Sequence, residues 1–339
     1  MEKKVKIQIV RQESNMVGDT VCIIPMVKAL KKKYPDSYLA LVYGWSHYEV
    51  PYQKIIPELD EVLFYDNSSL KSKMKLLIEL RKKKFDIGIV PSTVKISANS
   101  HIINFLSGAK KRIGVKSIDG KKNKTHFLLN IKSDFDWNKK LIHQMQRGLD
   151  IVRQIGCDMS EDEIKNIHHN ISEPEKIFAE EFFKKHFPDK SRLIIGFHSG
   201  AGKIENKWGY ENFAELIEII YKKYNSYILV TTGVTDKKTT NQLTEILDKK
   251  NIPYVVLCEN TGNFIAVIIR ISLYITNDTG SMHLAWLSGV RIISLFLQSN
   301  FYKWKPLSDG CKSVVSSSEN INEIKVSEVF KIVKEMIVK

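Results

Sequence analysis

Tyr274-Ile275-Thr276-Asn277-Asp278-Thr279-Gly280-Ser281-Met282-His283 is the stretch that decides the fold: an apolar strand pattern breaks at Asp-Thr-Gly and an apolar helical pattern follows. A strand that ends in such a turn directs backbone N–H groups outward, and a helix beginning near Ser281 adds the positive end of its dipole. Two similar loops precede it, at Gly18-Asp19-Thr20 and at residues 196–202. Three such loops predict a ligand that carries a diphosphate.

Strand-like and helical patterns alternate along the whole chain. Strand-like runs lie at residues 5–10, 38–43, 62–65, 87–90, 193–197, 227–232 and 254–257. Helical patterns lie at residues 21–33, 70–84, 137–155, 210–224, 237–249 and 264–270. This order is typical of an α/β protein with parallel sheets that helices cover on both faces, and with ligands at the carboxyl ends of the strands.

The pattern restarts after residues 156–174, a polar and acidic segment that is the best candidate for a linker. We therefore expect two Rossmann-like, doubly wound domains facing each other across a cleft. The first domain is expected over residues 1–170 and the second over residues 171–320, with a closing helical segment at residues 321–339.

Composition indicates a soluble globular protein, since 43% of the 339 residues are hydrophobic and 27% are charged. No apolar stretch approaches the roughly 18 residues that span a bilayer, and the N-terminus enters a strand pattern without a signal-peptide core. Four cysteines lie far apart and form no Cys-x-x-Cys pair, so neither a disulfide framework nor a zinc site is indicated. A cytoplasmic location is expected.

Positive charge is concentrated in the first half of the chain. Residues 1–150 hold 28 Lys and Arg against 15 Asp and Glu, whereas residues 151–339 hold 24 against 23. This asymmetry favours an anionic partner, although a lysine-rich solvated surface would look the same. No recognised nucleic-acid motif accompanies the basic runs, and aromatic residues are not interleaved with them, so no nucleic acid is expected.

Several groups of residues, in this order and spacing, resemble the bacterial heptosyltransferase family. They are Gly18-Asp19 with Pro25, residues 196–201, Lys207-Trp208 with residues 211–214, Asn277-Asp278-Thr279-Gly280 with residues 283–285, and Trp304-Lys305-Pro306. The resemblance implies the GT-B fold, with residues 321–339 packing back on the first domain. It also implies inverting transfer of heptose from ADP-heptose to the lipopolysaccharide inner core, without metal or cofactor.

The chain departs from the family pattern at three places. Asn206 stands where the family usually places a lysine, Gly209 replaces a proline, and residues 297–300 replace a Gly-Pro-Thr continuation. The lysine that pairs with the diphosphate is therefore open between Lys203 and Lys207. Another nucleotide sugar for a surface glycan, an epimerase, or a nucleotide-sugar-binding protein without catalysis remain as alternatives.

Inverting transfer needs a base for the acceptor hydroxyl and donors for the departing diphosphate. By resemblance the base is Asp19, although Asp is also a favoured N-cap of the helix that follows. Donor groups are expected from the Gly200-Ala201-Gly202 loop, from the Thr279-Gly280-Ser281 turn and from a lysine. The alternative for the glycines is ordinary turn geometry.

Three further side chains have two readings each. Asp236 is a candidate for the nucleotide ribose or a helix cap. Asp278 either accepts from a ribose hydroxyl or, as we prefer, orients the amides of its loop. His283 either touches a phosphate or holds its helix against a neighbouring loop.

Asp134-Phe135-Asp136 resembles a metal motif, but such spacing arises easily by chance among 38 acidic residues.

The basic runs of the first half suggest a partner at the inner face of the inner membrane. Each lysine near an anionic leaflet contributes about 1 kcal/mol, so several would give peripheral attachment to a surface that carries a phosphorylated lipopolysaccharide core acceptor. A monomer is expected. The runs are Lys31-Lys32-Lys33, residues 81–84, residues 110–112 and Lys121-Lys122.

Overall fold

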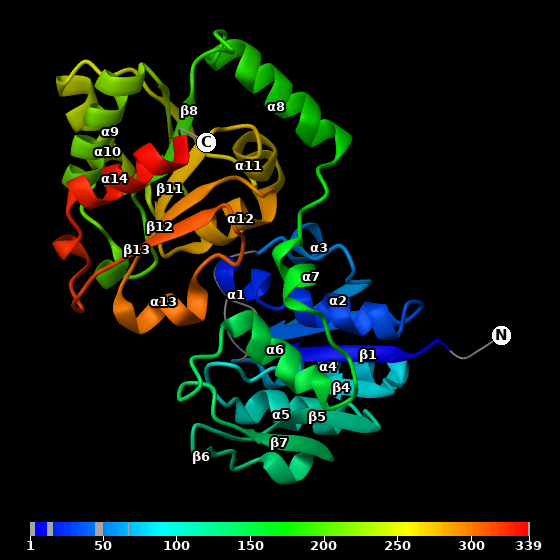
Figure 1. Ribbon diagram of the computed structural model, residues 1–339. Coiled ribbons are helices and arrows are strands. Elements are labelled where there is room, and N and C mark those ends of the chain that lie inside the picture. The colour runs from blue at the N-terminus through cyan, green and yellow to red at the C-terminus, as the bar shows by residue number, and fades with distance from the viewer. Residues whose placement is uncertain (1–3, 12–15, 45–49, 67, 338–339) are drawn as a thin grey trace. The chain divides into compact units, whose positions relative to one another are not determined.

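The computed structural model describes residues 4–11, 16–44, 50–66 and 68–337. The chain divides into two compact units, Met1–Ile164 and Lys165–Lys339, which are described in turn (Figure 1). No helix in the described ranges combines the length and the apolar character needed to cross a bilayer.

The first unit is built on a mostly parallel sheet in the order β3-β2-β1-β4-β5. On the far side of β5, β7 adds in parallel and the short β6 adds antiparallel. Its elements are β1 (Lys6–Arg11), α1 (Val17–Val21), α2 (Ile24–Lys33), β2 (Tyr38–Gly44), α3 (Tyr52–Ile55), β3 (Glu61–Tyr65), α4 (Leu70–Lys83), β4 (Ile87–Ile89), α5 (Ala98–Leu106), β5 (Lys111–Ile118), β6 (Lys121–Lys122), η1 (His126–Leu128), β7 (Ile131–Phe135), α6 (Gln144–Arg153) and α7 (Glu161–Lys165).

The predicted helix at residues 21–33 is two helices in the structure. Pro25 has no N–H to donate to the carbonyl of Val21, and α1 ends at Val21 while α2 begins at Ile24. The predicted helix at residues 137–155 is shorter as well, because His143 caps α6 by accepting the N–H of Met145. Asp19 consequently lies inside the short helix α1, not in an open turn.

The second unit is built on a fully parallel sheet in the order β10-β9-β8-β11-β12-β13. Chain order reverses between β8 and β11, which are neighbours in the sheet. Its elements are α8 (Glu173–His186), β8 (Ile194–His198), η2 (Ile204–Asn206), α9 (Tyr210–Tyr224), β9 (Tyr227–Thr231), α10 (Lys237–Lys249), β10 (Val255–Leu257), α11 (Thr261–Ile268), β11 (Leu273–Asn277), α12 (Gly280–Ser288), β12 (Ile292–Phe296), α13 (Gln298–Trp304), β13 (Cys311–Val315), η3 (Ile321–Glu323) and α14 (Val326–Ile337).

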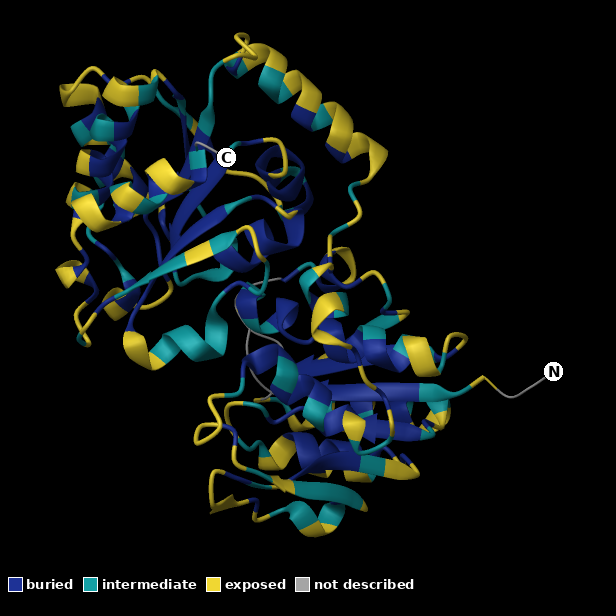
Figure 2. Cartoon of the chain, in the orientation of Figure 1, coloured by how far each residue is buried: buried dark blue, intermediate teal, exposed yellow. Residues whose placement is uncertain are grey.

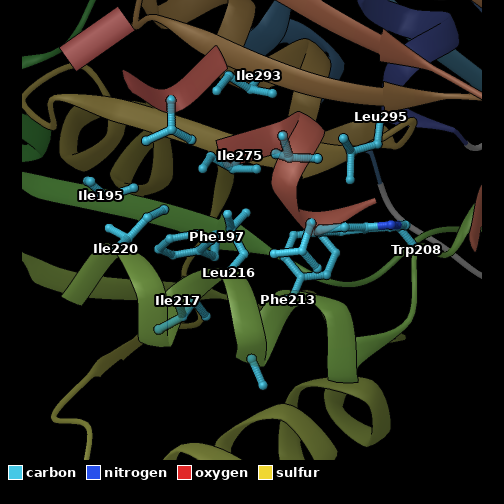
Figure 3. Packing of buried hydrophobic residues seen from close by; sticks show 14 of the residues in the cluster. Ile195, Phe197, Trp208, Phe213, Leu216, Ile217, Ile220, Ile275, Ile293 and Leu295 are labelled. Atoms are coloured by element: carbon cyan, nitrogen blue, oxygen red, sulfur yellow. The ribbon is translucent and has the colours of Figure 1, made fainter. Parts of the chain in front are cut away.

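Both sheets confirm the predicted doubly wound α/β class. In the second unit β8 and β11 are buried on both faces, as a parallel sheet between two helical layers requires (Figure 2). Figure 3 shows Phe197 and Ile275 of the sheet packed against Phe213 and Leu216 of α9. This core holds the carboxyl ends of β8 and β11 in place.

The closing helix α14 packs on the second unit. Val329 and Val333 are 0% exposed and belong to the core that α9 and the sheet form. Contacts of α14 run to α9, β12 and β13. The apolar face of α14 is thus part of the second unit's core, and the expectation that residues 321–339 pack back on the first domain stays a prediction.

Candidate active site

Asn277, the last residue of β11, joins the two loops at the point where the strand order reverses. Its Nδ2 donates to the carbonyl oxygens of Ser199 and Gly200 at 3.0 and 3.2 Å. Its Oδ1 accepts the backbone N–H of Trp208 at 3.2 Å. One buried amide thus fixes both ends of the loop that follows β8. Asn277 belongs to the motif quoted from the sequence, where it has no assigned role; its signal is a polar residue at the end of a largely apolar strand.

Trp208 anchors the far end of that loop in the core. Its side chain is 0% exposed, its ring meets Phe213 at 5.1 Å between centroids, and its Nε1 donates to the carbonyl of Ile324 at 2.8 Å. Burial of so large a side chain at the end of this loop holds its nine preceding residues beside the carboxyl ends of the strands. Within that loop Ala201 is buried, whereas Gly202 is exposed.

The first turn of α12 lies at the same edge of the sheet. Thr279 is its N-cap in an extended conformation, and within the described residues no side chain caps this helix. Gly280 and Ser281 open the helix, and the Ser281 hydroxyl is buried next to the hydroxyl of Tyr274. Backbone N–H groups that no side chain caps form an arrangement that an anion can satisfy.

Asp278 faces the loop after β8. Its Oδ2 accepts from Asn206 Nδ2 at 3.2 Å, and Asn206 Oδ1 accepts from Asn300 Nδ2 at 3.3 Å. Burial raises the pKa of Asp278 to about 7, against the opposing charge of Lys203. The carboxyl group is thus held by a neutral amide. The hydrogen bonds of this chain join side chains only, so the expectation that Asp278 orients the amides of its own loop stays a prediction.

Asp236 forms a second polar cluster, at the ends of β8 and β9. It occupies the N-cap position of α10, but its side chain makes no cap hydrogen bond. The carboxylate lies 3.6 Å from His198 Nε2, and His198 Nδ1 lies 3.0 Å from Thr231 Oγ1 and 3.1 Å from the Thr231 carbonyl. The imidazole beside it holds the pKa of Asp236 below its usual value. Asp236 is therefore the N-cap residue of α10 by position, without a capping hydrogen bond from its side chain, and the ribose reading stays a proposal.

Gly200 is required by the approach of Asp236. A Cβ placed on Gly200 would lie 2.3 Å from Asp236 Cγ, and its φ is not in the left-handed region. Turn geometry is consequently not the reason for glycine here. The loop must pass close to the carboxylate, and only glycine leaves room.

The two candidate lysines differ in their surroundings. Lys203 has a side chain that is 64% exposed and lies 3.9 Å from Glu205, and its charge acts on Asp278. Lys207 Nζ donates to Thr239 Oγ1 at 3.4 Å, and its charge acts on Asp236. Lys203 is therefore the lysine associated with the first turn of α12, whereas Lys207 is associated with the start of α10.

His283 lies one turn into α12 and is 4% exposed. Its ring meets Trp304 edge-on at 6.1 Å between centroids, and burial lowers its pKa to about 4. The side chain is therefore neutral at pH 7 and adds no positive charge to a phosphate site. This placement favours the reading in which His283 holds α12 against α13.

Asp19 belongs to the first unit and sits in the first turn of α1. The N-cap of that helix is Met16, so the alternative in which Asp19 caps the helix is wrong. Its backbone carbonyl accepts Arg11 Nη1 at 3.0 Å. Burial raises the pKa of Tyr52. The charge of Arg11 lowers this pKa and the charge of Asp19 raises it, so both side chains lie close to Tyr52.

Metal ligands are not assembled in the part of the chain that the structure describes: no three His, Cys, Asp or Glu side chains gather there as a site. Asp134 of the sequence Asp-Phe-Asp instead pairs with Lys116 at 2.9 Å and accepts from Ser117 Oγ at 2.6 Å.

Comparison with known proteins places these features in a family. Residues 73–333 match glycosyltransferase family 9, described as heptosyltransferases. A lipooligosaccharide heptosyltransferase 2 of Campylobacter jejuni is 24% identical over 300 residues, which cover 86% of this chain and 81% of that protein.

Solved structures share the fold. The E. coli ADP-heptose LPS heptosyltransferase II superimposes with a TM-score of 0.76 at 18% identity, covering 98% of both chains. An E. coli heptosyltransferase solved with ADP superimposes with a TM-score of 0.70 at 13% identity, covering 98% of this chain and 99% of that one. The two-domain GT-B architecture that the sequence predicts is confirmed by this likeness.

Proposed function

Because the chain belongs to glycosyltransferase family 9, the heptosyltransferases, we propose that it transfers heptose from ADP-heptose to the inner core of lipopolysaccharide, with inversion. The chain is a glycosyltransferase by its family. The single observation that carries the finer proposal is the uncapped first turn of α12 beside the loop that Asn277 holds, because this arrangement suits the diphosphate of a nucleotide sugar.

ADP-heptose is proposed as the donor because two of the compared proteins point to it. One is named an ADP-heptose LPS heptosyltransferase and the other was solved with ADP. The acceptor is proposed from the same names, together with that of the Campylobacter lipooligosaccharide enzyme. We further propose that the protein works as a monomer on the cytoplasmic side of the inner membrane, where such an acceptor would be presented.

In this scheme the Asp19 carboxylate takes the proton of an acceptor hydroxyl. The hydroxyl oxygen forms a bond to the anomeric carbon of the sugar while the bond from that carbon to the diphosphate oxygen breaks, with its electron pair leaving on ADP. The backbone N–H groups of Gly280 and Ser281, together with Lys203, stabilise the charge that develops on the diphosphate. The scheme calls for no cofactor.

Asp278 and Asp236 take different parts in the proposal. Asp278 is assigned to positioning of the Asn206 loop, because its Oδ2 accepts from Asn206. Asp236 has a side chain that is only 12% exposed and is engaged by His198, so a ribose hydroxyl would have to share it. We retain Asp236 as the proposed ribose contact, through the carboxylate oxygen that His198 does not face.

A different nucleotide sugar is the second candidate, and one observation favours it. Asn206 is 6% exposed, and its amide hydrogen-bonds on both sides: Nδ2 donates to Asp278 and Oδ1 accepts from Asn300. At this position, where the resembled pattern has a lysine, the site therefore carries a neutral group. A site with one fewer fixed positive charge fits a donor whose sugar makes more of its contacts through hydrogen bonds.

Incubation with single nucleotide sugars tests the proposal. ADP-heptose and several UDP-sugars are each supplied with and without deacylated lipopolysaccharide core, and nucleotide release is measured. Release from ADP-heptose that depends on the acceptor supports heptosyl transfer. Release from a UDP-sugar alone selects the second candidate, and binding of ADP without any turnover would leave a nucleotide-sugar-binding protein.

A further inference from the structure

Helix α4 of the first unit leaves an apolar stripe exposed. Its inner face packs through Leu76 and Leu80, which are 3% and 0% exposed, into the core of the unit. Leu70, Met74 and Ile78 are 75%, 53% and 53% exposed. Because residues four apart lie on one face of a helix, these three side chains form a continuous row away from the core.

Basic side chains flank the row. The fourteen residues of α4 include six Lys and Arg and one acidic residue, Glu79. At 100° per residue, Lys71, Lys75 and Lys82 fall beside Ile78 on the outer face, and all three are exposed. Within the described residues none of the three makes an ion pair, whereas Lys83 at the inner edge pairs with Glu61 at 2.8 Å.

Two of the other basic runs of the first unit, Lys31-Lys32-Lys33 and residues 110–112, are partly neutralised by carboxylates. Lys31 pairs with Asp60 at 3.2 Å, Lys32 with Glu163 at 2.5 Å and Lys110 with Asp86 at 2.9 Å. The excess charge that the sequence places in this half is therefore not spread evenly over its surface. The outer face of α4 combines unneutralised charge with exposed apolar area.

We propose that the outer face of α4 docks on an anionic lipid surface, with Leu70, Met74 and Ile78 entering the boundary between headgroups and acyl chains. A helix that carries an apolar row beside lysines is the form that lies in such an interface. Lysines near lipid phosphates add attraction that salt weakens. The inference rests on the proposed function in one respect, since a glycolipid acceptor gives the enzyme a reason to be at a membrane.

Charge selects the lipid surface over a second copy of this chain. Two copies of α4 packed face to face would bring their basic flanks together, and like charges across an interface disfavour association. An anionic surface meets the same flanks with opposite charge.

Helix α8 of the second unit is a matched control. It also has fourteen residues and exposes an isoleucine, Ile177, to 50%. Its composition differs, with four acidic and three basic residues. Lys184 and Lys185 are exposed on it, so equivalent substitutions can be made there.

Co-sedimentation of the full chain with vesicles tests the proposal. We expect binding to vesicles of phosphatidylethanolamine with phosphatidylglycerol, weaker binding at high salt, and far weaker binding to phosphatidylcholine alone. Lys71→Gln, Lys75→Gln and Lys82→Gln together lower the partition coefficient about 100-fold, because each lysine contributes about fivefold. Met74→Ser with Ile78→Ser lowers it at least about tenfold. Ile177→Ser with Lys184→Gln and Lys185→Gln leaves it unchanged.

Equal binding to both kinds of vesicle, or an equal loss in the α8 variant, overturns the proposal. So does a dimer in sedimentation velocity that Met74→Ser with Ile78→Ser dissociates, because the row would then serve a second copy. Turnover with a soluble deacylated acceptor should be unchanged in the α4 variants. A chain that binds anionic vesicles but releases no nucleotide from any sugar would contradict the proposed function while supporting this inference.

Discussion

Gly200 and Asp236 are in contact across the ends of β8 and β9, and the Asp236 carboxylate fills the space in which a side chain on Gly200 would stand. A Cβ there would lie 2.3 Å from Asp236 Cγ and 2.7 Å from Asp236 Cβ. The loop after β8 and the start of α10 are therefore fitted to one another. Asp236 is also the residue that faces His198 Nε2 at 3.6 Å.

Gly200→Ala should destabilise the protein by about 1–3 kcal/mol, since an added methyl group must displace a buried carboxylate or the loop. Thermal unfolding of the variant measures the loss of stability, and titration with ADP measures any effect on binding. Asp236→Gly in the same chain removes all three close contacts and should restore part of the stability. Gly310→Ala is the matched control, because its nearest neighbour would be at 3.7 Å. Equal effects of the two alanine variants would contradict the contact.

Asp19→Asn should lower turnover about 100-fold to 10,000-fold, the usual contribution of a general base. The amide cannot take the proton of the acceptor, but it preserves the shape of the side chain. Because Met16 and not Asp19 is the N-cap of α1, the melting temperature should not change. Acceptor-dependent nucleotide release checks the prediction, with binding of ADP as the control. Turnover equal to that of the unsubstituted protein would remove Asp19 from the mechanism.

Lys203→Ala should weaken ADP binding by about tenfold or more, because a charge-assisted hydrogen bond to phosphate is worth about 1.5–3 kcal/mol. Lys207→Ala should have a smaller effect, since Lys207 is occupied by Thr239 and faces Asp236. Isothermal titration with ADP and with AMP measures the difference, which should be larger for the diphosphate. The opposite ranking of the two variants would assign the diphosphate to Lys207.

Asp278→Asn should make stability less sensitive to pH. The folded-state pKa of Asp278 is raised to about 7, so the native state holds its proton more tightly than the unfolded state, whose carboxyl titrates near 3.8. Stability is therefore full below pH 4 and falls as the pH rises toward 7, by on the order of 1 kcal/mol per pH unit. The amide has no proton to lose.

Urea unfolding at pH 4.5 and pH 8 measures this difference. The free energy of unfolding of Asp278→Asn should exceed that of the unsubstituted protein at pH 8 and approach it at the lower pH. A variant that is less stable at both values would mean that the carboxylate form makes a favourable contact in the native state.

Elements with strong periodicity were predicted from the sequence at their observed bounds. The helices at residues 210–224 and 237–249 are α9 and α10. Both have apolar residues on one face at helical spacing and lie against the sheet, so local pattern and tertiary packing agree. The helix predicted at residues 21–33 is observed as α2, which ends at Lys33 as predicted but begins at Ile24, because Pro25 has no N–H to continue the helix from α1.

Site residues were predicted where they follow a strand and missed where their role depends on a distant partner. Thr279, Gly280 and Ser281 do form an uncapped helix start. The role of Asn277 could not be assigned from the sequence, because it lies in hydrogen bonds to Ser199 and Trp208, about seventy residues away. The sequence left His283 open between a phosphate contact and a packing role, and its contact with Trp304 favours the packing role.

The sequence alone determined the alternation of strands and helices, and with it the loops at the carboxyl ends of β8 and β11, because hydrophobic periodicity and turn residues act locally. Tertiary structure alone decided that Asn206 meets Asp278, that Gly200 meets Asp236, and that α14 buries its apolar face in the core of the second unit. These contacts join residues far apart in the chain. They exist only once the strand order has brought the ends of separate strands to one edge of the sheet.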